Sequence, residues 1–80
     1  MEITDVKALL PVVEEKLKAV YGEAAKNIRV QGPLEQKKQY WVVNAEIDDE
    51  KISRSISMNI RIEDGIVTKM ELREERALSR

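Results

Sequence analysis

The chain has 80 residues, with no cysteine, no histidine, and 14 basic against 15 acidic side chains, for a formal net charge of −1. This length predicts one domain. The absence of cysteine excludes disulfides and thiolate chemistry, and the absence of histidine removes the usual neutral-pH proton donor and the commonest metal ligand. The charge balance gives the protein as a whole no attraction to nucleic acid or to an anionic membrane.

The first residues, Met1–Asp5, are acidic and lack a basic segment followed by an apolar run, so we expect no secretory signal. Uninterrupted apolar stretches are only a few residues long, so we expect no membrane span. Together these features predict a cytoplasmic protein.

A helix is expected from about residue 4 to residue 22. Thr4 or Asp5 suits the N-cap, and Gly22 is the expected stop. Apolar residues recur every three or four positions in between, at Val6, Leu9, Leu10, Val13, Leu17, Val20 and Tyr21. Pro11 removes one backbone N–H. We favour a single helix bent at Pro11, because the stripe keeps its phase; the alternative is a short turn before a helix that starts near Pro11.

Four strands are expected after the helix, near 28–31, 39–48, 51–62 and 66–74, with a charged tail at 75–80. Gly32 and Pro33 are expected to end the first strand. Apolar and polar residues alternate along the next two strands, which is typical of strands with one buried face. The apolar positions are Trp41, Val43, Ala45 and Ile47, followed by Ile52, Ile56, Met58, Ile60 and Ile62.

The turns predict the strand register. A three-residue loop, Glu63–Gly65, with Gly65 in the left-handed conformation, keeps apolar residues opposite one another. The resulting pairs are Ile62 with Ile66, Ile60 with Thr68, Met58 with Met70, Ile56 with Leu72 and Arg54 with Glu74. A turn at Asp48–Lys51 gives the pairs Ile47 with Ile52, Val43 with Ile56 and Trp41 with Met58.

These elements predict an α+β fold, with one N-terminal helix packed on one face of a three- to four-stranded antiparallel meander. We expect residues 1–80 to form a single domain. The expected helix side of the core is Leu10, Val13, Leu17 and Val20. The expected sheet side of the core is Trp41, Val43, Ile56, Met58, Ile60, Met70 and Leu72.

The other face of the sheet is the candidate functional surface. Its centre is small and uncharged, and charged residues lie at its margins. Such a surface suits contact with another protein, although an antiparallel sheet can also leave one face open to water. The residues of this face are Tyr40, Val42, Asn44, Ser55, Ser57 and Asn59. We predict a non-enzymatic interaction or assembly domain that binds itself or another protein, with strand addition at an exposed sheet edge as a second route.

Other functions have weaker signals. Arg29, Lys37, Lys38 and Tyr40 offer a basic–aromatic patch for single-stranded nucleic acid, but only Tyr40 is an aromatic residue on the outer face. The acidic turn Asp48–Glu50 lacks the spacing of a calcium loop. A chain without histidine and cysteine cannot assemble the usual nucleophilic triads, and its three glycines are too far apart for a phosphate loop. We therefore predict no catalytic, metal or cofactor site.

The order of helix, Tyr40–Glu46 strand and Ile60–Val67 hairpin resembles two known groups. One is the helix-plus-meander module of PepSY domains, which implies peptidase inhibition or extracytoplasmic regulation. The other is the gas vesicle protein O family, which this chain also resembles in its Arg-rich end, Arg73–Arg80. The second resemblance implies a gas vesicle accessory protein as an alternative function. Neither resemblance assigns a functional residue.

Overall fold

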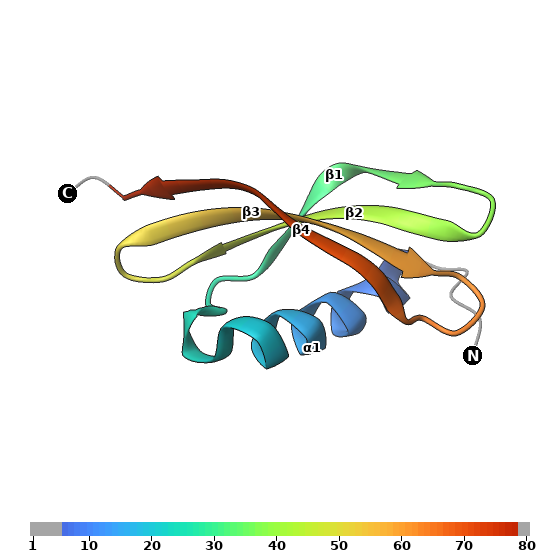
Figure 1. The fold of residues 1–80 in the computed structure, drawn as a ribbon, viewed down its shortest axis with the longest axis horizontal. Coiled ribbons are helices and arrows are strands. Elements are labelled where there is room, and N and C mark those ends of the chain that lie inside the picture. Colours follow the sequence, from blue (N-terminus) through green and yellow to red (C-terminus); the bar gives the residue numbers. More distant parts are fainter. Residues whose placement is uncertain (1–5, 79–80) are drawn as a thin grey trace.

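The computed structural model describes residues 6–78, which form one α-helix and a four-stranded antiparallel sheet (Figure 1). The strands follow one another in the order β1-β2-β3-β4, and α1 lies along one face of this meander. The predicted α+β fold is confirmed. The elements are a 3-10 turn (Val6–Ala8), α1 (Leu9–Tyr21), a second 3-10 turn (Gly22–Ala24), β1 (Arg29–Gln36), β2 (Tyr40–Asp48), β3 (Ile52–Arg61) and β4 (Val67–Ala77).

The helix starts later than the favoured interpretation placed it. The 3-10 turn Val6–Ala8 leads into α1 at Leu9, so Pro11 lies in the first helical turn. A proline there removes no helical hydrogen bond, because the first four N–H groups have no partner within a helix. The alternative of a turn before the helix describes this arrangement better, and the proposed caps Thr4 and Asp5 lie outside the described residues.

Gly22 ends the helix as predicted. Its φ of 60° lies in the left-handed region, and its N–H donates to the carbonyl of Lys18. Glycine adopts this conformation without the steric cost that a Cβ atom brings. The chain then turns through Gly22–Ala24 toward β1, and the N–H of Asp48 donates to the carbonyl of Lys26 at 2.9 Å, which ties this connection to the end of β2.

Only one row of the apolar helical stripe is buried. Leu9, Val13 and Leu17 are at most 1% exposed, whereas Leu10 and Val20 are 42% and 51% exposed. The predicted burial of Leu10 and Val20 is therefore wrong. Positions four apart form a row inclined to the helix axis, and α1 contacts the sheet along that row rather than across the full width of the stripe.

The sheet supplies most of the core through alternating residues of β2 and β3. These buried residues are Trp41, Val43, Ala45, Ile47, Ile56, Met58 and Ile60. The period-two alternation predicted from the sequence therefore gives the correct buried face. Leu72 does not belong to this core, contrary to the prediction, because it is 46% exposed on the edge strand β4.

β1 is longer than predicted and continues through Gly32 and Pro33. Gln31 lies opposite Asn44, and Glu35 lies opposite Val42, so three residues of β1 span the single β2 position between them. This irregularity accommodates Gly32 and Pro33 within an edge strand, where a missing backbone N–H costs no hydrogen bond inside the sheet.

The β2–β3 turn is tighter than predicted. The N–H of Asp49 donates to the carbonyl of Ile52, which leaves a two-residue loop, and Ile47 lies opposite Arg54 instead of Ile52. Val43 accordingly pairs with Met58, and Trp41 with Ile60. The error is two residues, and a shift by an even number keeps every side chain on its predicted face.

Two register shifts flank a regular stretch of β4. The loop Ile62–Gly65 is one residue longer than predicted: the N–H of Arg61 donates to the carbonyl of Ile66, and Gly65 has the predicted left-handed φ, 73°. Ile62 therefore does not pair with Ile66, and Ile60 pairs with Val67 instead of Thr68. Thr68 is an extra residue that restores the predicted register. The confirmed pairs are Met58 with Met70 and Ile56 with Leu72.

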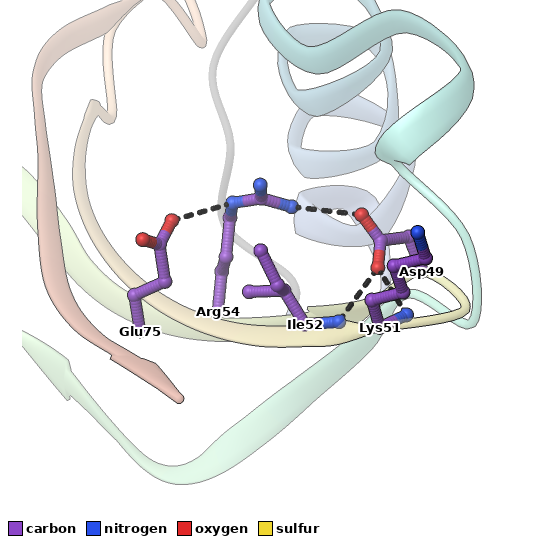
Figure 2. A network of polar contacts seen from close by, with 5 residues as sticks. All are labelled: Asp49, Lys51, Ile52, Arg54 and Glu75. Atoms are coloured by element: carbon purple, nitrogen blue, oxygen red, sulfur yellow. Dashed lines mark hydrogen bonds and ion pairs between the residues drawn. The ribbon is translucent and has the colours of Figure 1, made fainter. Parts of the chain in front are cut away.

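A second extra residue, Arg73, brings Glu75 opposite Arg54. The predicted pairing of Arg54 with Glu74 is therefore wrong by one position. Arg54 lies between two carboxylates, with its Nε 3.0 Å from Glu75 and its NH1 3.4 Å from Asp49 (Figure 2). Its guanidinium also lies 5.5 Å from the centre of the Tyr21 ring. One charged side chain thus joins α1, the β2–β3 turn and β4.

Candidate functional site

The structure brings the six predicted face residues together on β2 and β3. Val42 lies opposite Asn59, and Asn44 lies opposite Ser57, so these four side chains form a continuous uncharged block. Tyr40 extends one end of the block, opposite Arg61, and Ser55 extends the other end, opposite Glu46. We call this set, Tyr40, Val42, Asn44, Ser55, Ser57 and Asn59, the outer face.

The outer face is the side of the sheet turned away from α1. Its residues alternate with the core residues Trp41, Val43 and Met58, and no element among residues 6–78 lies over it. Asn44 is exposed and the other five residues are half-buried. The outer face is a largely uncharged surface with one apolar side chain, Val42, near its middle.

Two neighbouring residues belong to this surface and were absent from the predicted set. Gln31 of β1 lies opposite Asn44 and widens the uncharged block toward the β1 edge. Ser53 lies on the same side, opposite Asp48, and is only 3% exposed. Both positions have a signal in the sequence: the alternation of Ile28–Gln31 indicates Gln31, and the serines at every second position of β3 indicate Ser53.

An ionic cluster on β1 and β2 closes one margin of the outer face. The NH2 of Arg29 donates to Glu46 at 2.6 Å, and its NH1 donates to Asp48 at 3.0 Å. The hydrogen bond from Arg29 holds the pKa of Asp48 below its usual value, and Asp48 and Glu46 raise the pKa of Arg29. Sequence reasoning missed this cluster because the register of β1 against β2 was not predicted.

The remaining margins also carry charges of opposite sign side by side. Arg61 binds Asp64 through two nitrogens at the β3–β4 hairpin, which lowers the pKa of Asp64. Along β4 the ion pairs are longer, with Lys69 3.8 Å from Glu71 and Arg76 4.0 Å from Glu74. The margins of the outer face therefore consist largely of ion pairs within the chain.

The alternative nucleic-acid patch is divided. Lys37 and Lys38 lie in the β1–β2 turn and Tyr40 begins β2, where its carbonyl accepts a hydrogen bond from the N–H of Lys37 at 2.8 Å. Arg29 lies at the other end of β1, roughly 20 Å away for a strand of this length. Lys37 is ion-paired with Glu35, which raises the pKa of Lys37, and Arg29 is engaged by two carboxylates.

The hollows of the described surface offer little for a small ligand. The groove between α1 and the β3–β4 hairpin has a volume of about 520 Å³ and is lined by Val12, Lys16 and Ile66 among others. Of its two acidic side chains, Glu15 and Asp64, Asp64 is already bound to Arg61 and to the N–H of Ile66. Within residues 6–78, no three acidic side chains come together as metal ligands.

Comparison with protein-family models, with curated proteins and with solved structures finds no match for this chain. The resemblances to the gas vesicle protein O family and to PepSY domains stay predictions. No helix in the described part of the chain has the length and apolar character needed to cross a membrane.

Proposed function

We propose that this protein is a non-enzymatic interaction domain whose outer face binds the outer face of a second copy. The proposal is supported by the block of Val42, Asn44, Ser57 and Asn59, which is uncharged and lies at the centre of the open side of the sheet. An interface core is typically poor in charge and surrounded by a polar rim.

The ion pairs at the margins support the same function. Burying an isolated charge at an interface costs several kcal/mol, whereas a charge that already has its partner brings a smaller penalty. Arg29 is held by Glu46 and Asp48, and Arg61 is held by Asp64. A second surface can therefore cover the centre without stripping water from unpaired arginines at its rim.

The test is the double variant Val42→Glu, Ser57→Glu, which places two carboxylates in the middle of the outer face. Sedimentation equilibrium should show self-association of the wild-type chain and at least about tenfold weaker association of the variant, since like charges across an interface cost several kcal/mol. Circular dichroism checks that the variant is folded.

The matched control is Ala19→Glu, Val20→Glu, which adds the same two charges on an exposed side of α1. This control should associate like the wild type. A wild-type chain that stays monomeric at all concentrations, or a face variant that associates as well as the control, would overturn the proposal.

A further inference from the structure

The two edges of the sheet differ in how they present their backbone. β1 is interrupted between Gln31 and Glu35, where its register shifts, and it contains Pro33, which has no N–H to donate. β4 is the longest strand, with 11 residues, and its outer edge faces no other strand among the described residues. β4 also carries two extra residues, Thr68 and Arg73, but it contains no proline, so it is the edge better suited to strand addition.

That edge has two regular parts, Lys69–Leu72 between the extra residues Thr68 and Arg73, and Glu74–Ala77 after Arg73, of which the first is the more central. Met70 and Leu72 lie on the helix side, opposite Met58 and Ile56, whereas Lys69 and Glu71 lie on the outer side, opposite Asn59 and Ser57. Any antiparallel partner strand must match these sides, since directly opposed residues in a ladder share a face.

Pairing of β4 with a second β4 satisfies this condition in two central registers. A two-fold axis at Glu71 places the two Glu71 carboxylates opposite each other and Lys69 opposite Arg73, which is repulsive. A two-fold axis at Met70 places the two Met70 side chains opposite each other and, on the outer side, Lys69 of each copy opposite Glu71 of the other. Of these two registers, only the second gives attraction between the charged residues of Lys69–Leu72.

The exposure of Lys69–Leu72 supports an edge that can accept a partner strand. The side chains of Lys69 and Glu71 are 65% and 52% exposed, and their ion pair within the chain, at 3.8 Å, is at the limit of contact. Leu72 is among the few large exposed apolar residues, and it lies on the helix side directly beside the proposed axis. A partner strand would cover Leu72 and shorten the contacts of both charged residues.

We infer that the free edge of β4 pairs antiparallel with β4 of a second copy about Met70, and that it joins two sheets into one continuous sheet of eight strands. This interface is separate from the outer face, although it rests on the same occupant, a second copy of the chain. Both α1 helices then lie on one side of the joined sheet, and both outer faces lie on the other.

The test reverses the charges. Lys69→Glu alone and Glu71→Lys alone each place like charges opposite one another in the pair, so each variant should associate at least about tenfold more weakly than the wild type. The double variant Lys69→Glu, Glu71→Lys restores both attractive pairs and should associate like the wild type. An equimolar mixture of the two single variants should form a mixed dimer, because each then supplies the charges that the other needs.

The mixture separates edge pairing from a change within each chain, since both single variants lose the internal Lys69–Glu71 contact whether or not they are mixed. Sedimentation of the mixture as the sum of two non-interacting species would overturn the inference. Hydrogen exchange gives a second readout: amides between Val67 and Arg73 should gain protection as the wild-type concentration rises, and unchanged exchange would also overturn it.

The background Val42→Glu, used here as the face variant, keeps this test separate from the outer face, because Val42 pairs with no residue of β4, whereas Ser57 lies opposite Glu71. If the edge pairs, the face variant remains a dimer that responds to the charge reversal. If only the outer face binds, the face variant is monomeric and the reversal has no effect on the wild type.

Discussion

Nε of Arg54 donates a hydrogen bond to Oε2 of Glu75 at 3.0 Å, and this contact connects the C-terminal half of β4 to the central strand β3. It arises because the extra residue Arg73 shifts β4 by one position, which brings Glu75 rather than Glu74 to the helix side. The Arg54 side chain is only 16% exposed, so this is the most buried guanidinium of the ion pairs described above. Its replacement should therefore cost more than the loss of a surface ion pair.

Arg54→Ala is expected to lower the free energy of unfolding by about 1–3 kcal/mol, since it removes hydrogen bonds to two carboxylates and the contact with Tyr21. The matched control is Arg76→Ala, which removes an exposed pair at 4.0 Å and should cost less than about 1 kcal/mol. Urea denaturation of both variants measures the difference. Equal losses would contradict a structural role for Arg54.

Ile56 and Leu72 lie directly opposite each other on the same side of the sheet, but α1 and its neighbours bury only Ile56. Ile56→Ala should cost about 2–5 kcal/mol, because it leaves a cavity in the core. Leu72→Ala should cost less than about 1.5 kcal/mol in the monomer, because much of the side chain already contacts water. Thermal and urea unfolding at low concentration measure both, and a Leu72 loss equal to that of Ile56 would refute this burial assignment.

Gly65 adopts φ 73° at the end of the β3–β4 loop. Gly65→Ala should cost about 1–2 kcal/mol, because a Cβ atom crowds the backbone in the left-handed region. Gly65→Asn is the control, and it should cost less because asparagine tolerates this conformation better than alanine does. Denaturant midpoints rank the three proteins, and an alanine variant as stable as the wild type would be inconsistent with the loop conformation.

Stability should fall in acid. The N–H groups of Lys51 and Ile52 each donate to Oδ1 of Asp49 at 2.7 Å and hold the pKa of Asp49 below its usual value of 3.8, as Arg29 does for Asp48. A lowered pKa in the folded state means that the unfolded chain binds the proton more readily. The stabilisation is therefore complete above the ordinary pKa and is lost as the pH falls through the lower, folded value.

Asp49→Asn tests this dependence, because the amide keeps an acceptor oxygen for the two N–H groups but does not titrate. The drop in unfolding free energy between about pH 5 and about pH 3 should be smaller in the variant than in the wild type. Urea titrations at the two pH values measure that drop. An identical drop in both proteins would show that the Asp49 carboxylate does not contribute.

The predictions from sequence were correct where the local sequence pattern allows only one structure. The alternation of Ile56, Met58 and Ile60 determines which face is buried, whatever the register. Gly22 and Gly65 stand where the chain needs a positive φ, and both adopt one. These features depend on side-chain spacing and on a missing Cβ, which can be read without knowing the partner strand.

The predictions were wrong where the sequence allows several local structures and tertiary packing determines which one forms. The helical stripe included Leu10 and Val20, but the angle at which α1 crosses the sheet buries only one row. The length of the β2–β3 turn was predicted wrongly because composition does not determine it. Asp49 accepts hydrogen bonds from the N–H groups of Lys51 and Ile52, and these bonds make the loop shorter. The extra residues Thr68 and Arg73 have no signature in a single sequence.

For the outer face, the alternation of β2 and β3 was enough to group the six residues on one side. It could not reveal the cluster of Arg29, Glu46 and Asp48, which depends on how far β1 extends and where it shifts. The nucleic-acid patch failed to come together for the same reason, since a longer β1 moves Arg29 away from Lys37 and Lys38.

In the proposed edge-paired dimer, the shift within β1 would limit further growth of the joined sheet. A chain with two equivalent open edges can add copies without end, as in a fibril, because each addition exposes a fresh template. In the proposed dimer both free edges would be β1 strands, which are irregular between Gln31 and Glu35 and would offer a third copy no long regular edge to extend. In that dimer, Gly32 and Pro33 would thus limit the assembly to a finite sheet.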